Sequence, residues 1–201
     1  MVLSKNMQKL VAGSSTIRKL FEEGIELAKE VGAENVYDFS LGNPAAPVPE
    51  EVKKSIYDIL ENRNANFVHC YMPNAGYPEV REKVAANLNK KYNSSFTKDD
   101  IIMTVGAAGG INCVLRCLLE QEDEVLCFAP FFGEYNSYVM NFGGNLKVVP
   151  ADYETFQLNV EEADKYITER TKAVIINNPN NPTGALMSRD MLEEIVQIAR
   201  E

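Results

Sequence analysis

The segment NNPNNPTGA occupies residues 177–185, between the apolar run Ala173–Ile176 and an amphipathic segment that starts near Ser188. A strand, a rigid turn and a helix in that order form the place where α/β enzymes hold their ligands. The two prolines fix φ and lack an N–H, whereas the glycine permits a backbone shape that other residues resist. The pattern predicts a loop that aims a polar side chain, with Asn181 as the candidate. An ordinary surface turn uses the same residue types and stays an alternative.

A second turn lies in the segment TVGAAGGIN, residues 104–112. Apolar residues recur from Ile111 to Leu118 at the spacing of a helix that packs on a core, so the turn precedes a helix N-terminus. Free amides and the helix dipole favour an anion there by about 0.3–1 kcal/mol. Close packing of the helix on a sheet is the alternative, and the glycines do not form the G-x-G-x-x-G of nicotinamide-cofactor sites. The residues expected to hold the anion are Gly106, Ala107 and Ala108.

Helical and extended segments alternate along the chain with short connections, which predicts a mostly parallel sheet covered by helices. The expected strands are Ile101–Val105, Glu124–Phe128, Leu146–Pro150 and Ala173–Asn177. The expected helices are Ser15–Val31, Glu50–Glu61, Pro78–Tyr92, Ala108–Leu119, Glu134–Phe142, Val160–Ile167 and Ser188–Glu201.

Composition is that of a soluble globular protein, with 45% hydrophobic and 24% charged residues among 201. A net charge of -9 and a pI near 4.8 argue against nucleic acid or an anionic membrane as partner. The N-terminal residues show neither a long apolar core nor a small-residue cleavage pattern, and no later apolar run approaches the length of a membrane span. A cytoplasmic location is therefore expected.

The four cysteines form no C-x-x-C pair and share the chain with a single histidine, His69, so no metal centre is expected. Cys113 and Cys117 lie four residues apart and would share one helix face. A reactive pair is conceivable, but buried thiols are the commoner case and are expected here. His69 and Cys70 are adjacent in sequence and seldom face one another, which argues against a cysteine nucleophile.

The segment 177–185 resembles the NPxNPTG signature of the class I and II aminotransferases, fold-type I enzymes that use pyridoxal 5'-phosphate (PLP). Further segments resemble the family's pattern in the right order: LGNPAAPVP (41–49), YMPNAGYPEVR (71–81), TVGAAGGIN (104–112) and APFFGEY (129–135). The resemblance runs from about Ser15 to the last residue. It implies a truncated aspartate aminotransferase-like fold, a three-layer α/β/α arrangement. Residues 1–48 would form an N-terminal arm and part of a small domain, and 49–201 the first part of a large PLP-binding domain.

The resemblance also implies roles for individual residues in binding cofactor and substrate. Asn181 would hydrogen-bond the phenolic oxygen of PLP, and Phe132 would stack on its pyridine ring. Tyr71 would reach the cofactor phosphate of a neighbouring subunit in a homodimer, and the backbone of Gly42 would meet the substrate carboxylate. The cofactor phosphate would lie at Gly106, Ala107 and Ala108.

The activity implied is transfer of an amino group between an L-amino acid, with aspartate as first candidate, and a 2-oxo acid. The family carries its Schiff-base lysine, its pyridinium aspartate and its substrate-binding arginine beyond the point matched by residue 201, so we expect no catalytic residue in this chain and no activity from it alone. The family also places the segment Ile101–Val105 beside strands outside this chain, which leaves the other three strands to pair. A non-catalytic PLP- or phosphate-binding α/β module, or a fragment of a related PLP lyase, stays open.

Overall fold

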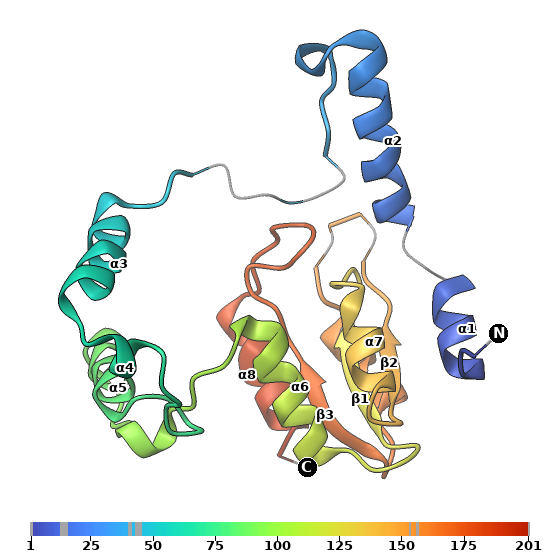
Figure 1. The fold of residues 1–201 in the computed structure, drawn as a ribbon. Coiled ribbons are helices and arrows are strands. Elements are labelled where there is room, and N and C mark those ends of the chain that lie inside the picture. Colours follow the sequence, from blue (N-terminus) through green and yellow to red (C-terminus); the bar gives the residue numbers. More distant parts are fainter. Residues whose placement is uncertain are drawn as a thin grey trace. The chain divides into compact units, whose positions relative to one another are not determined.

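The computed structural model describes residues 2–12, 16–39, 42, 46–152, 154–155 and 157–200. The chain divides into two units, Met1–Cys70 and Tyr71–Glu201. Figure 1 shows the helices and strands of each unit. The predicted division into 1–48 and 49–201 concerns the arm and the two domains of the resembled family, and it stays a prediction.

The described part of the first unit is helical and contains no buried residue. The predicted helix Ser15–Val31 is confirmed as α2 from Thr16, whereas Ser15 lies outside the described residues. The predicted helix Glu50–Glu61 is confirmed as α3 and is one residue longer. The helices of this unit are α1 (Lys5–Ala12), α2 (Thr16–Val31), η1 (Ala33–Asn35), α3 (Glu50–Asn62) and α4 (Ala65–Val68), of which α1 and α4 were not predicted.

The second unit contains a three-stranded parallel sheet in the order β2-β1-β3. The central strand β1 (Glu124–Phe128) has the predicted bounds, and all five of its residues are buried. Its last four residues, Val125–Phe128, form the continuous apolar run that is typical of a parallel strand covered on both faces. The outer strands are β2 (Asn145–Val149) and β3 (Thr171–Ile175), one and two residues earlier than predicted.

The fourth predicted strand, Ile101–Val105, is wrong for this structure. Ile101 has extended dihedrals, φ -115° and ψ 129°, but residues 101–105 join no ladder among the described residues. The side chain of Val105 is 94% exposed. A strand is defined by its hydrogen-bonded neighbours, and no described strand lies beside this segment. The pairing of the other three strands is as expected.

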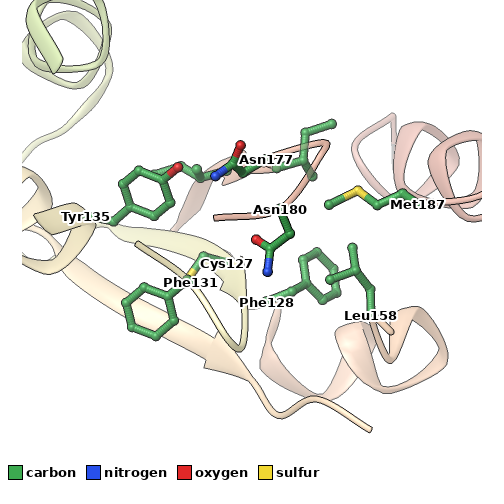
Figure 2. Close-up of a pocket in the computed structure, with 10 residues that line it drawn as sticks. Cys127, Phe128, Phe131, Tyr135, Leu158, Asn177, Asn180 and Met187 are labelled. Carbon is green, nitrogen blue, oxygen red and sulfur yellow. The ribbon is translucent and has the colours of Figure 1, made fainter. Parts of the chain in front are cut away.

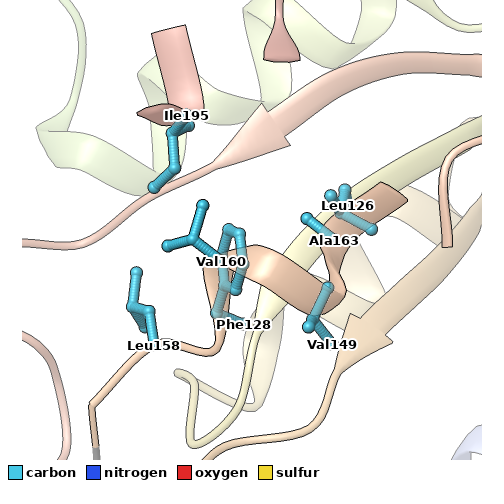
Figure 3. Close-up of a cluster of buried hydrophobic side chains, with 7 residues drawn as sticks. All are labelled: Leu126, Phe128, Val149, Leu158, Val160, Ala163 and Ile195. Atoms are coloured by element: carbon cyan, nitrogen blue, oxygen red, sulfur yellow. The ribbon is translucent and has the colours of Figure 1, made fainter. Parts of the chain in front are cut away.

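Helices cover both faces of the sheet, as the predicted three-layer arrangement requires. Neighbouring strand residues point to opposite faces, so Val125 and Leu126 enter different cores. Val125 packs with residues of α6 and α7, while Leu126 packs with residues of η3 and α8 (Figure 3). None of the described helices is both long and apolar enough to cross a bilayer. The helices of this unit are α5 (Pro78–Tyr92), η2 (Lys98–Asp100), α6 (Gly106–Leu118), α7 (Glu134–Met140), η3 (Val160–Tyr166) and α8 (Arg189–Ile198).

The predicted helix Val160–Ile167 is a 3-10 helix, not an α-helix. A 3-10 helix has three residues per turn, so side chains three apart share one face. Val160 and Ala163 are both buried in the core beneath β1, and Tyr166 packs against it. The spacing of three suits a 3-10 helix, but residues three apart also share a face of an α-helix, so the sequence pattern did not distinguish the two.

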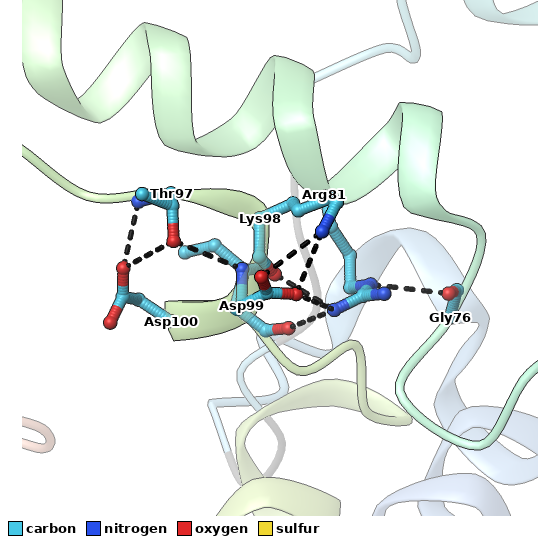
Figure 4. Close-up of polar contacts among 7 residues, drawn as sticks. Gly76, Arg81, Thr97, Lys98, Asp99 and Asp100 are labelled. Carbon is cyan, nitrogen blue, oxygen red and sulfur yellow. Dashed lines mark hydrogen bonds and ion pairs between the residues drawn. The ribbon is translucent and has the colours of Figure 1, made fainter.

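The arginine of the segment YMPNAGYPEVR has a structural role (Figure 4). The side chain of Arg81 is 12% exposed, and its guanidinium donates to the carbonyl oxygens of Gly76 at 3.2 Å and Lys98 at 2.8 Å. Thr97 and Asp100 close η2 with a capping box, whose hydrogen bonds hold the pKa of the Asp100 carboxyl below its ordinary value. Arg81 therefore joins the start of α5 to η2.

An acidic group lies at the amino end of the sheet, away from the carboxyl ends of the strands. The Glu124 carboxylate accepts the Thr168 hydroxyl at 2.6 Å and pairs with Lys147 at 3.1 Å. The Thr168 hydrogen bond is the main cause that lowers the pKa of Glu124 below 4.5; burial opposes it and Lys147 adds to it. A lowered pKa in the folded state gives stability that is present above 4.5 and is lost as the pH falls through the folded value.

We therefore expect Glu124→Gln to flatten the acid limb of the stability curve. Urea unfolding between pH 7 and pH 3 should show a smaller loss for this variant than for the wild type, because glutamine does not titrate. Glu161→Gln, at an exposed glutamate, serves as control and should follow the wild type. If the free energy of unfolding falls equally with pH in Glu124→Gln and in the wild type, the lowered pKa of Glu124 does not contribute to acid unfolding.

The cysteines differ from the expectation of buried thiols. Cys70, Cys113 and Cys117 are exposed, and Cys127 is buried in β1. In α6, Leu115 faces the sheet, so the two cysteines on either side of it point away. The predicted core spacing also fails at Leu118, which is exposed. Apolar residues occupy a larger part of the α6 surface than the part that packs on the sheet.

Burial raises the pKa of the Cys127 thiol to about 12. Because the thiolate is the reactive form, we expect Cys127 to stay unmodified by Ellman's reagent at pH 8 while the other three thiols react. In denaturant all four should react at similar rates. If Cys127 also reacts fast in the native protein, the sheet opens more readily than the burial of Cys127 indicates.

Candidate functional site

Three connecting segments meet at one edge of the sheet. The strands β1 and β3 are parallel, so the segments that follow them, 129–133 and 176–188, leave at the same edge. Helix α6 precedes β1, is joined to it by a short turn and packs on it through Leu115. The helix is therefore antiparallel to β1, and its first residue, Gly106, lies toward the carboxyl edge of the sheet. The carboxyl edge of an open α/β sheet is where such folds bind ligands.

The loop between β3 and α8 is closed by hydrogen bonds around Asn180. The backbone N–H of Asn180 donates to the Ala185 carbonyl at 2.9 Å, and the Gly184 N–H donates to the Asn180 carbonyl at 2.7 Å. Gly184 has φ +73°, a conformation that glycine adopts without strain. The Asn180 side chain is buried and donates to the Pro130 carbonyl and to the Thr183 hydroxyl (Figure 2). The predicted rigid loop is thus tied to the segment that follows β1.

Asn181, the candidate from the sequence, lies on the exposed side of this loop. With the Asn177 amide oriented to satisfy its neighbours, its oxygen accepts the Asn181 N–H at 3.0 Å and its nitrogen donates to the Pro179 carbonyl at 3.1 Å. The Asn181–Pro182 peptide bond is cis. The Asn181 carboxamide forms no hydrogen bond with a described residue, so it is free to meet a ligand.

The sequence did not predict a role for the half-buried Asn177 or the buried Asn180 of this loop. Asparagine commonly bonds nearby backbone in turns, and a loop with two prolines needs donors from elsewhere. An asparagine next to a proline is a signal of such a role and marks Asn180, whereas Asn177 does not adjoin a proline. This signal does not reveal which distant carbonyl Asn180 binds.

The segment after β1 presents an aromatic group. Phe132 meets the Tyr135 ring edge-on, with centroids 5.7 Å apart and planes at 79°, and remains 38% exposed. Phe131 stacks on the same tyrosine at 6.5 Å. Burial raises the pKa of Tyr135, and a hydrogen bond with the Asn177 side chain partly offsets the effect. Phe132 is therefore an exposed ring supported by a buried one.

The turn before α6 offers unpaired backbone amides. Gly106 has φ +67°, and its N–H donates to the Thr104 carbonyl at 3.0 Å. The next two amides, of Ala107 and Ala108, have no acceptor in the part of the chain that the structure describes. All three residues are exposed, and no described atom lies within 4 Å of where a Cβ on Gly106 would stand. An anion has both donors and room at this turn.

The cavity beneath the loops is small. It holds about 10 Å³ and is lined by residues that include Cys127, Phe131, Tyr135, Asn177 and Asn180 (Figure 2). This volume suits about one water molecule. A ligand larger than a water molecule therefore does not fit inside this cavity.

The remaining predicted site residues are not gathered at these loops. Tyr71 is 104% exposed, so its side chain packs on none of the three segments. Gly42 belongs to the first unit, where it is exposed. The rest of the segment LGNPAAPVP is described only from residue 46 onward, and residues 41 and 43–45 lie outside the described part.

Comparison with known proteins gives a family match over most of the chain. The family model described as aminotransferase class I and II matches residues 33–201. The chain is 38% identical to aromatic-amino-acid aminotransferase 2 of Thermococcus litoralis, an alignment that covers 100% of this chain and 49% of that protein. It is 37% identical to the aspartate aminotransferase of Pyrococcus abyssi, covering 93% of this chain and 46% of that protein. The chain thus spans about half the length of these relatives.

Solved structures agree with the sequence comparison. An amino transferase from Eubacterium rectale superposes with a TM-score of 0.93 at 37% identity, over 100% of this chain and 50% of that one. A double mutant of Thermus thermophilus aspartate aminotransferase superposes with a TM-score of 0.86 at 29% identity, again over 100% of this chain and 50% of that one.

Proposed function

We propose a function from one premise: this chain belongs to the aminotransferase class I and II family and has the fold-type I aspartate aminotransferase fold in part. In our proposal it contributes the first half of a PLP site to an enzyme that moves an amino group between an L-amino acid and a 2-oxo acid. One observation supports the proposal most directly. The unpaired amides of Ala107 and Ala108, the exposed ring of Phe132 and the carboxamide of Asn181 belong to segments at the same edge of the sheet.

The residues at that edge fit PLP. The unpaired amides of Ala107 and Ala108, with open space before Gly106, suit a phosphate group. The exposed ring of Phe132 suits an aromatic heterocycle. The Asn181 carboxamide suits a ring oxygen, to which its nitrogen would donate. When bound, PLP supplies an electron sink for reactions at the amino-acid α-carbon.

The chain's own residues would bind and orient the cofactor. The helix N-terminus at Gly106 would fix the phosphate end, Asn181 would fix the ring in its plane, and Phe132 would cover one ring face and exclude water from it. Asn181 stands on a loop closed by its own hydrogen bonds, so its position is set before the ligand arrives. Preorganised groups of this kind bind without the cost of ordering them first.

Further parts of the proposal concern the second subunit and the substrate. We assign Tyr71, whose ring is fully exposed, to the cofactor phosphate of a partner subunit in a homodimer. The backbone of Gly42 would meet the substrate carboxylate. Aspartate is the first amino donor to test, since two of the relatives are an aspartate and an aromatic-amino-acid aminotransferase. A cytoplasmic location and a large domain that starts at residue 49 belong to the same proposal.

Residues 1–201 alone would not catalyse amino transfer. The segments that form the edge, 104–108, 129–133 and 176–188, contain no lysine. Lys147 and Lys172 lie at or near the starts of β2 and β3, and Lys147 is paired with Glu124. The amine that covalent PLP chemistry requires is therefore not offered by the residues of these three segments.

The test is a titration of residues 1–201 with PLP, followed by borohydride reduction and mass analysis. Saturable binding without a specific lysine adduct supports the cofactor half-site. A stoichiometric adduct at one lysine would contradict the proposed lack of a catalytic amine, and absence of binding would contradict the cofactor site. Binding of inorganic phosphate in competition with PLP, without any effect of amino acids, would favour a non-catalytic phosphate-binding module. Turnover of aspartate and 2-oxoglutarate by the purified chain would contradict its proposed inactivity.

A further inference from the structure

Asn180 joins two loops that are far apart in sequence. Its side chain is 9% exposed, and its nitrogen donates to the Pro130 carbonyl at 2.9 Å and to the Thr183 hydroxyl at 3.0 Å. Pro130 lies 50 residues earlier, two residues after the end of the neighbouring strand β1. A buried carboxamide is costly without partners, so these bonds favour one arrangement of the two loops over others.

The residues next to this bond are the two proposed cofactor contacts. Asn181 follows Asn180 directly, and Phe132 lies two residues after Pro130. We propose that Asn180 is a positioning residue, which holds the Asn181 carboxamide in place relative to the Phe132 ring. The inference rests on the proposed function, because its consequence for binding depends on those two contacts.

A second set of bonds supports the same arrangement. The Asn177 oxygen accepts the Asn181 N–H at 3.0 Å. The Asn177 side chain also bonds Tyr135, the ring against which Phe132 packs. The loop is therefore tied to the segment 129–135 on both sides of Pro179, through Asn177 and through Asn180 (Figure 2).

Two substitutions separate the hydrogen bond from the space that the side chain fills. Asn180→Ala removes the donor to Pro130 and should weaken PLP binding about tenfold, as loss of a supporting hydrogen bond often does. Asn180→Asp keeps the shape, but a carboxylate cannot donate to a carbonyl, whereas a protonated carboxyl can. Burial raises the pKa of such a carboxyl. The defect of Asn180→Asp relative to the wild type should therefore shrink as the pH is lowered from 8 to 5.

The matched control is Asn89→Ala. Asn89 in α5 also binds backbone with its carboxamide: its nitrogen donates to the Phe96 carbonyl at 2.7 Å, and its oxygen accepts the Phe96 N–H at 2.7 Å. It lies outside the three loops. We expect Asn89→Ala to leave PLP binding at the wild-type value.

The experiment compares the wild type and these variants, each as the 15N-labelled chain of residues 1–201. NMR records the amide signals of Phe132 and Asn181, and equilibrium dialysis gives the Kd for PLP from pH 5 to pH 8. Asn180→Ala should shift both signals and raise the Kd about tenfold, with recovery at low pH only in Asn180→Asp. An unmoved Phe132 signal in Asn180→Ala would overturn the proposal whether or not PLP binds. If the wild type does not bind PLP, the proposed function fails and the positioning role fails with it. If the wild type binds PLP and Asn180→Ala binds it equally well, the positioning role alone fails.

Discussion

Replacing Leu126 by alanine should lower the free energy of unfolding by about 2–5 kcal/mol. Leu126 lies in the central strand and is fully buried. It packs in the core beneath β1 with residues from η3 and α8, so the shorter side chain would leave a cavity shared by three elements. The surrounding backbone is held by two parallel ladders and cannot collapse onto the space. Urea unfolding, followed by far-UV circular dichroism, measures the effect.

Leu118→Ala is the control for this prediction, because it removes the same atoms from an exposed position in α6. Its cost should stay below about 1 kcal/mol. An equal loss in both variants would mean that the exposed face of α6 is covered in solution. An effect of Leu126→Ala below 1 kcal/mol would contradict the core as described, since a large-to-small change at a fully buried leucine costs roughly 2 kcal/mol or more.

The central strand and the rigid loop of residues 177–185 could be predicted from the sequence because their signals are local. The run EVLCF is apolar apart from its first residue, and its burial on both faces follows from that composition. The segment Ile101–Val105 has a similar composition but forms no strand, because strand pairing depends on a neighbour and not on the segment alone. The local sequence pattern therefore predicts an extended backbone, but it does not predict which strand pairs with it.

The supporting residues of the site could not be predicted for a related reason. The motif singles out Asn181 as the proposed cofactor contact, whereas the hydrogen bond of Asn180 depends on the Pro130 carbonyl, 50 residues away. The exposure of Cys113 depends on which face of α6 meets the sheet, and most of that helix is apolar. A short loop sequence therefore predicts which side chain is free to meet a ligand better than it predicts what holds that side chain in place.

Placing a carboxylate at the anion turn should have opposite effects on stability and on binding. In Ala108→Asp the new charge lies in the first turn of α6, where the helix dipole favours it by about 0.3–1 kcal/mol. The same charge would stand beside the proposed phosphate. Two unit charges 4 Å apart repel by about 4 kcal/mol at an effective dielectric constant of 20, so PLP binding should weaken by about 100-fold or more.

Ala108→Asn separates this charge effect from the size of the side chain. Asparagine is nearly as large as aspartate and can bond the same amides but carries no charge, so its loss of PLP affinity should stay below about tenfold. Equilibrium dialysis with PLP and with pyridoxal, which lacks the phosphate, tests the cause directly. Pyridoxal should bind the aspartate and asparagine variants with similar affinity, because the repulsion acts on the phosphate. If Ala108→Asp gains stability and still binds PLP as the wild type does, the phosphate lies elsewhere than at the amides of Ala107 and Ala108.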